Sequence, residues 1–407
     1  RFTSIWVVSQ KQRLLSHGRD KGCFFIPFSL RHSQTVIYRS KSNFLEDPKM
    51  KTMNNLKKLR AVMLAIVMLL TMAACAGKSN TPAAETPAQT EAPAAEEAPA
   101  AEEPAAEKAA YKVSIIKQLD HASLDEIANA ISARLDEIAA ENDVTIEYTV
   151  TSGQNDQTIL KQLSDQAIAD GVDAIIPIAT TAAQISALSA EDSKTPVVYA
   201  AISDPAAAKL TGIDYVTGTS DALNTAFILD MMLKQNPDTA KVGLLYSLSE
   251  PNSATPIADA KAYLDEKGIA YTEQTANTND EVVAAAAALI ADGVDAIFTP
   301  TDNVIMAAEL AIYEDLAKAG IPHYTGADSF VRNGAFATCG VNYTSLGART
   351  ADLAYQAITE GMSGLDDYYL MDGGIITVNT ETAAELGIDP AVFADMGELV
   401  EVGTTKE

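Results

Sequence analysis

The sequence predicts an α/β protein with two similar lobes, each a doubly wound parallel β-sheet, joined by a multi-strand hinge. Helical and strand patterns alternate along the folded part, as is typical of parallel sheets covered on both faces. The octapeptide IADGVDAI occurs at 168–175 and again at 290–297. Each copy runs from a helix end, at a glycine, into a short apolar strand and a polar turn. The alternative is that two βα units share this sequence by chance.

The first 110 residues are expected to lie outside the folded body. Residues 1–49 are basic and aperiodic, so we expect upstream sequence outside the native reading frame, or else a genuine basic extension. Residues 50–74, starting at Met50 or Met53, have the layout of a secretory signal, with a basic stretch and an apolar run too short to span a bilayer. Residues 75–110 are rich in Ala, Pro and Glu and predict an extended tether.

The sequence Met72-Ala73-Ala74-Cys75 closes the apolar run and resembles the lipobox of bacterial lipoproteins. The resemblance implies that Cys75 becomes the lipidated first residue after cleavage. It also implies attachment to the extracytoplasmic face of the bacterial cell membrane. The alternative is an ordinary secreted protein with an incidental cysteine at this position.

The charge distribution separates the leader from the body. Residues 1–74 hold 13 of the 29 basic residues but 3 of the 55 acidic ones, which leaves 16 basic and 52 acidic residues, a net charge of −36, from Cys75 onward. Such an acidic chain argues against nucleic acid and anionic lipid headgroups as partners. Beyond Cys75 the one remaining cysteine is Cys339, which excludes a disulfide framework and a cysteine-based metal site.

The first lobe is expected at 111–218 and about 343–372, and the second at 219–342 and about 373–390, with 391–407 as a C-terminal tail. In the first series, apolar runs predict strands at 112–117, 144–150, 174–178 and 196–201, and helical spacing predicts helices at 124–141, 159–170 and 182–190. In the second series, the same criteria predict strands at 241–246, 269–274, 296–300 and 322–325, and helices at 225–235, 256–267, 281–292 and 304–319. Later patterns predict strands at 335–342 and 374–378, helices at 346–359 and 382–386, and lobe crossings near 215–221, 339–342 and 370–377.

Polar residues follow many of these strands, where ligands bind in parallel α/β sheets. Thr180 and Thr181 offer hydroxyls at a helix start, which suits a carboxylate, although they could simply cap the helix. Asp204, Asp302 and Asp328 suggest a cationic group on a ligand, since a buried carboxylate needs a partner; the alternative is a helix cap or a hinge ion pair. The further candidates are His121, Leu124, Ser203, Asn252, Ser253, Thr301 and Asn303.

Several of these turns carry a family resemblance that covers Tyr111 to about Asp389. The segments that carry it are His121-Ala122-Ser123-Leu124-Asp125, 178–184, Ile202-Ser203-Asp204-Pro205, 217–221, 249–253, Pro300-Thr301-Asp302-Asn303 and 326–329. Together they resemble the substrate-binding lipoproteins of bacterial ABC importers, in particular the tryptophan and tyrosine transporter binding proteins, which have the type I periplasmic-binding fold. The chain departs from this pattern at Thr181, where much of the family is expected to have Pro, and around Asp328.

The resemblance implies a monomer that captures a small solute between its lobes and delivers it to an ABC permease and its ATPase. An amino acid, possibly aromatic, is the expected solute; a nucleoside, a thiamine-like compound or a branched amino acid is also compatible. No catalytic residue, cofactor or metal site is expected, because the sequence holds no GxSxG, Walker, HExxH or CxxC motif. The alternatives are a surface-anchored sensor that docks on a receptor and a secreted enzyme that uses the same cleft.

Overall fold

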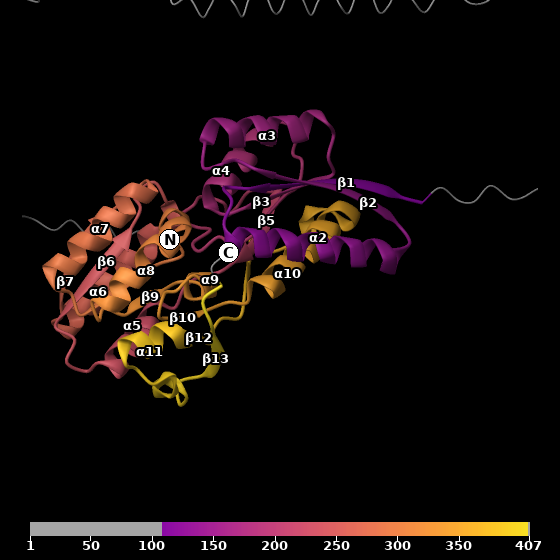
Figure 1. Cartoon of the computed structure of the whole chain (residues 1–407). Coiled ribbons are helices and arrows are strands. Elements are labelled where there is room, and N and C mark those ends of the chain that lie inside the picture. Colours follow the sequence, from indigo (N-terminus) through magenta and orange to yellow (C-terminus); the bar gives the residue numbers. More distant parts are fainter. Residues whose placement is uncertain (1–107, 406–407) are drawn as a thin grey trace, which may run out of the picture. The chain divides into compact units, whose positions relative to one another are not determined.

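The structure is a computed structural model that describes residues 108–405. The expected leader at 1–74, Cys75 and most of the expected tether therefore lie outside the described residues. Within 108–405 the chain builds two parallel-dominated sheets with alternating helices, which confirms the predicted two-lobed α/β class (Figure 1).

The first lobe is built on a six-stranded sheet with the order β11-β5-β4-β3-β1-β2 and parallel pairing throughout. Its strands are β1 (Ala110–Lys117), β2 (Thr145–Ser152), β3 (Ala174–Ile178), β4 (Val197–Tyr199), β5 (Val216–Ser220) and β11 (Tyr369–Leu370). Its helices are α2 (Ala122–Asn142), α3 (Gln157–Ala169), α4 (Thr180–Ser189) and α10 (Tyr343–Glu360), with the short 3-10 helix η2 (Met362–Gly364). Helix α2 packs against α10 and α3 against α4, on opposite faces of the sheet (Figure 1).

The second lobe is built on a seven-stranded sheet with the order β13-β12-β10-β9-β8-β6-β7, in which only the β10–β12 pair is antiparallel. Its strands are β6 (Lys241–Tyr246), β7 (Ala270–Thr275), β8 (Ala296–Thr299), β9 (His323–Thr325), β10 (Ala337–Gly340), β12 (Ile375–Asn379) and β13 (Glu398–Val402). Its helices are α5 (Thr225–Gln235), η1 (Pro251–Ser253), α6 (Ala254–Lys267), α7 (Asn279–Asp292), α8 (Asn303–Lys318), α9 (Asp328–Arg332), α11 (Thr380–Leu386) and η3 (Pro390–Phe393).

The chain passes between the sheets three times, at 221–224, 341–342 and 371–374. The first sheet extends through Ser220, slightly beyond the expected lobe boundary at 218, because β5 pairs with β11 as far as Ser220 and Leu370. Three short crossings side by side form a hinge, because they limit the lobes to rotation about a common line.

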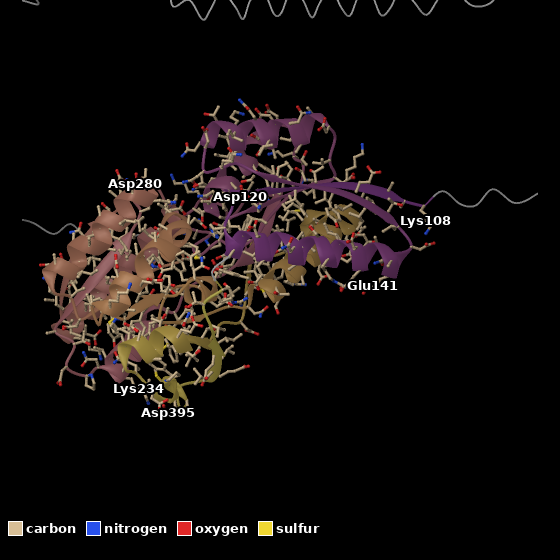
Figure 2. All side chains as sticks on the ribbon, viewed as in Figure 1. Lys108, Asp120, Glu141, Lys234, Asp280 and Asp395 are labelled. Carbon is tan, nitrogen blue, oxygen red and sulfur yellow. The ribbon has the colours of Figure 1, made fainter. Side chains whose placement is uncertain are left out.

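The C-terminal segment differs from the expected tail at 391–407. Strand β13 pairs in parallel with β12, and Phe393 is fully buried in the second lobe. Asp395 makes an ion pair of 2.5 Å with Lys234 of α5 (Figure 2). Without β13 the outer edge of β12 would leave its backbone hydrogen-bonding groups unpaired, which explains why this segment is ordered against the sheet.

The twin octapeptides occupy equivalent positions in the two lobes. The first joins the end of α3 to β3 and the second joins the end of α7 to β8. Gly171 and Gly293 each have the left-handed backbone, with φ of 67° and 65°. The shared sequence therefore encodes the same helix-to-strand connection twice, as its glycine predicted.

Helices α2 and α10 approach closely at Gly347, and this contact supplies a stability test. A Cβ on Gly347 would lie 2.7 Å from the Ala130 Cβ and 2.7 Å from the Ile127 carbonyl oxygen. Gly347→Ala should therefore lower the free energy of unfolding by about 1–3 kcal/mol through overpacking. An unconstrained Gly→Ala change inside a helix would instead raise it by about 0.5–1 kcal/mol.

Urea unfolding followed by circular dichroism measures this difference. Gly364→Ala is the matched control, because a Cβ at Gly364 meets no atom within 4 Å. A gain in stability for Gly347→Ala would contradict the tight contact between the two helices.

Candidate functional site

A small cavity lies between the lobes at the carboxyl ends of both sheets. Its residues follow β1, β3, β4 and β5 in the first lobe and β8 and β9 in the second, with further residues from η1 and α10. The cavity has a volume of about 20 Å³. The lobes are therefore close together, and a solute as large as an amino acid requires them to move apart.

Most of the predicted site residues line this cavity. From the first lobe they are His121, Leu124, Thr180 and Ser203, and from the second lobe Asn252, Thr301, Asp302 and Asn303. The structure thus brings Thr180 and Asp302, which follow the two octapeptides, to the same cavity. The geometric expectation behind the site, that both turns face one shared space, agrees with this placement.

Four predicted residues lie outside the cavity lining, and each has a structural partner instead. The Thr181 backbone N–H donates to Gln118 Oε1 (3.1 Å), and Ser253 Oγ donates to Asp302 Oδ2 (2.7 Å). Asp204 accepts from Thr255 Oγ1 of the other lobe (2.7 Å). Asp328 begins α9 and pairs with Arg332 one turn later.

Asp302 lines the cavity, but its carboxylate serves the fold. Oδ1 accepts from the backbone N–H groups of Val304 and Ile305, both at 3.1 Å, and so caps α8. Oδ2 accepts from the Ser247 N–H and from Ser253 Oγ, both at 2.7 Å. Four donors satisfy this fully buried group, so the capping alternative describes the observed geometry and no oxygen is left for a cationic ligand.

Asp221 is the carboxyl group that sequence reasoning missed. It follows β5 at the first crossing, is 5% exposed and lines the cavity. It accepts from Ser203 Oγ (3.0 Å) and from Tyr343 Oη (3.1 Å), and burial raises its pKa. Asp221 ends one of the segments that carry the family resemblance, which was the available signal. Its partner Tyr343 lies beyond the second crossing and carries no local signal.

The other unpredicted lining residues are small or apolar. They are Ser123, Ala179, Ala201, Met306, Ala327, Phe330 and Tyr343. Two of them, Ala179 and Ala201, have positive φ angles of 76° and 57°. Non-glycine residues with such a backbone cost about 1–3 kcal/mol and cluster where ligands are clamped, so the first lobe holds strain at the cavity wall.

Three polar atoms in the cavity lining are buried without a hydrogen-bond partner. They are His121 Nδ1, Thr180 Oγ1 and Asn252 Oδ1. An unpaired buried polar atom costs about 1–3 kcal/mol, and these three come from both lobes. Burial lowers the pKa of His121 to about 4, so its ring is neutral near pH 7 and one nitrogen can donate while the other accepts.

Hydrogen bonds join the lobes around the cavity. His121 Nε2 lies 2.9 Å from Asn303 Oδ1, and Ser203 Oγ lies 2.9 Å from Thr301 Oγ1. The hydroxyls of Ser123 and Ser329 are also paired. Gln118 Nε2 donates to Glu250 Oε1 (2.7 Å), and burial raises the pKa of Glu250 to about 8. These contacts hold the two lobes together.

Residues 108–405 contain neither a group of side chains that could ligate a metal ion nor a membrane-spanning helix. No group of three or more His, Cys, Asp or Glu residues in this part of the chain could hold a metal ion. No helix in the same range is both long enough and apolar enough to cross a bilayer.

The fold and the polar cavity between its lobes define a two-lobed solute-binding protein. The sequence matches the family described as ABC transporter substrate binding protein over residues 112–391, so the chain belongs to that family. It is 25% identical to the tyrosine-binding protein of Clostridioides difficile (strain R20291) over 284 residues, which is 69% of this chain and 81% of that protein.

Solved structures of related proteins share the fold, and two of them are compared with this chain. An ABC domain from Streptococcus pneumonia in complex with L-Trp is 28% identical, covers 72% of this chain and 100% of its own, and has a TM-score of 0.65. The ligand-free, open structure of a Clostridium difficile substrate binding protein with adhesive properties is 25% identical, covers 72% of this chain and 99% of its own, and has a TM-score of 0.55. Family and relatives are named as binding proteins, which fits the expectation of a protein without catalysis.

The role of Asp302 as a cap predicts a stability defect. Asp302→Ala should lower the free energy of unfolding by about 3 kcal/mol or more, because the α8 cap is lost and the buried donors of Ser247 and Ser253 lose their acceptor. Thermal unfolding by calorimetry would measure it. Asp389→Ala, which removes the exposed cap of η3, is the control, with an expected loss of about 1 kcal/mol. Equal losses in both variants would contradict the assigned role.

Proposed function

We propose that the chain binds a small solute, an amino acid, in the cavity between its lobes, with Asp221 accepting a hydrogen bond from the α-amino group. The observation that carries the proposal is the state of the Asp221 carboxyl group. It is buried and has two neutral hydroxyl donors, and the cavity lining contains no Lys or Arg. A buried carboxylate without a cation is costly, and an ammonium group supplied by the solute would offset that cost.

The solute carboxylate is proposed to lie at the first turn of α4. The helix start offers backbone N–H groups and a favourable dipole for an anion, and Thr180 Oγ1 is buried there without a partner. Asn252 and His121 add unpaired polar atoms from either lobe. A zwitterion would then place its positive end at the hinge and its negative end at α4.

The solute side chain is proposed to contact the apolar part of the lining. Leu124 of the first lobe and Met306, Ala327 and Phe330 of the second lobe form this part. An aromatic side chain suits Phe330 and Met306, since aromatic and thioether groups pack well against rings. The relatives support this choice, because one is named as a tyrosine-binding protein and another is a complex with L-Trp.

In this proposal the protein is a monomer outside the cytoplasm that delivers its solute to an ABC permease driven by an ATPase. Membership of the ABC substrate-binding family supports the transport role. Solute contacts from both lobes favour an arrangement that is closed around the solute, because they form together only when both lobes reach it. The open structure of the Clostridium difficile relative supports a lobe movement in this fold.

The amino-acid site is tested by titration calorimetry with L-tryptophan and L-tyrosine. Asp221→Asn should weaken binding by about 100-fold, because the substitution removes the charge that the ammonium group meets. Asp214→Asn changes an exposed carboxylate outside the cavity lining and should leave binding unchanged. For tryptophan, indole-3-propionate lacks the amino group and should bind the native protein and the Asp221 variant almost equally. Unchanged tryptophan and tyrosine binding in Asp221→Asn would contradict the site.

We further propose that Cys75, which lies outside the described residues, carries the lipid anchor. The support is the sequence Met72-Ala73-Ala74-Cys75 at the end of the apolar run. Cys75→Ala should move the protein from the membrane fraction of a bacterial host to the soluble fraction and abolish incorporation of radiolabelled palmitate. Cys339→Ala is the control, since that thiol is buried in the second lobe. Continued palmitate labelling of Cys75→Ala would disprove the anchor.

A further inference from the structure

Glu250 occupies a central position between the lobes without lining the solute cavity. It lies between β6 and η1 in the second lobe and is 3% exposed. Its Oε1 accepts from Gln118 Nε2 of the first lobe (2.7 Å), and its Oε2 accepts from Asn303 Nδ2 of its own lobe (2.6 Å). Two short side-chain hydrogen bonds therefore meet at one buried carboxyl group.

Each of these bonds continues to a wall of the cavity. Gln118 Oε1 accepts from the Thr181 N–H (3.1 Å), which fixes the first turn of α4 beside Thr180. On the other side, Asn303 Oδ1 lies 2.9 Å from His121 Nε2, which leaves His121 Nδ1 as the unpaired atom in the cavity lining. Glu250 thus connects the second lobe with the two polar groups that the first lobe offers to a solute.

We propose that Glu250 is the positioning residue that links closure of the lobes to the geometry of the solute site, and that closure is accompanied by proton uptake at its carboxyl group. The identity of the solute in this inference rests on the proposed function, whereas the contacts of Glu250 do not. When the lobes part, Glu250 loses Gln118 and gains water. When they close, water is excluded and the charged carboxylate loses its hydration.

The charges around Glu250 favour the neutral form on closure. Asp302, at the start of α8, is the charged group that acts on it, and the repulsion adds to the effect of burial. From the first lobe, Gln118 is neutral and His121 is neutral. Lys117, next to Gln118 in the chain, is paired with Asp120 and Asp125. No cation in the described part of the chain is paired with Glu250, and burial raises its pKa.

The hydrogen-bond network can accommodate both protonation states. Ionised Glu250 accepts from both amides, as observed. Protonated Glu250 can donate to Asn303 Oδ1 if that amide turns over, and Asn303 Nδ2 can then donate to His121 Nε2, because the neutral ring can carry its proton on Nδ1. The proton state of Glu250 would then decide whether His121 presents a donor or an acceptor to the solute.

The direction of the pH effect follows from the pKa. The closed form holds a proton that the open form releases above about pH 4.5, the ordinary value for Glu, so closure is favoured fully below that pH. The advantage declines as the pH rises and is lost above about pH 8. In this window the dissociation constant should rise by up to about tenfold per pH unit.

The test compares the pH dependence of L-tryptophan and L-tyrosine binding in three proteins by calorimetry. Between pH 6 and 8, native affinity should fall by about tenfold or more, whereas Glu250→Gln, which mimics the protonated group, should change by less than about twofold. At pH 6, Glu250→Gln should bind nearly as well as the native protein and Glu250→Ala about tenfold more weakly. Asp395→Asn, at an exposed ion pair of the second lobe, should keep the native profile. Parallel profiles for the native protein and Glu250→Gln would overturn the proposal.

A second measurement separates this proposal from the proposed function. Small-angle X-ray scattering without added solute should show that the radius of gyration of the native protein increases between pH 6 and 9, and that the radius of Glu250→Gln does not. If neither amino acid binds, the proposed function fails, and the scattering experiment alone then tests the role of Glu250 in closure. The same radius change in both proteins, or none in the native protein, would refute the role of Glu250.

Discussion

The three crossings between the lobes are the constraint on which the rest of the structure depends. They hold the carboxyl ends of two parallel sheets opposite each other, so the polar turns that follow the strands in both lobes face a single space. Each octapeptide is followed by a polar turn, and this arrangement places both turns at that space. A single flexible connection would leave the same turns on independent surfaces.

The buried carboxyl groups at the interface differ in how well the protein satisfies them. Asp302 receives four donors and completes the start of α8. Glu250 receives two amide donors, one from each lobe. Asp221 receives two hydroxyl groups and faces the cavity. Burial penalises the charge of each group to a similar degree. Asp221 has few donors and faces the cavity, so a ligand best explains it. Glu250 bridges the two lobes, so closure of the lobes best explains it.

The sequence did not predict strands β5 and β11 or helix α9, but it was sufficient to predict most of the other elements and most of the cavity wall. Both follow from local patterns: apolar periodicity sets the elements, and polar residues after parallel strands mark the binding edge. Thr180, Asn252 and Asn303 were found in this way. Asp302 was identified as a site residue, but an aspartate after a strand looks the same in sequence whether it caps the next helix or meets a ligand.

The features that escaped prediction depend on contacts between distant segments. Asp221 accepts hydrogen bonds from Ser203 and from Tyr343, which lies beyond the second crossing. The role of Glu250 requires Gln118 from the other lobe. Strand β13 is defined by its pairing with β12 and has a weak pattern of its own. All three features depend on partners from distant segments, which no local sequence pattern encodes.

The energetics of closure suit a receptor that must also release its solute. A hydrogen bond between neutral groups contributes about 0.5–1.5 kcal/mol net, so the few inter-lobe bonds favour the closed arrangement by only a few kcal/mol. Unpaired atoms at His121, Thr180 and Asn252, each costing about 1–3 kcal/mol, oppose it by a comparable amount. Because these terms nearly cancel, a solute that pairs with the free atoms can decide the balance. If every polar atom of the cavity had a partner within the protein, the lobes would close equally well without a solute, and closure would not depend on solute binding.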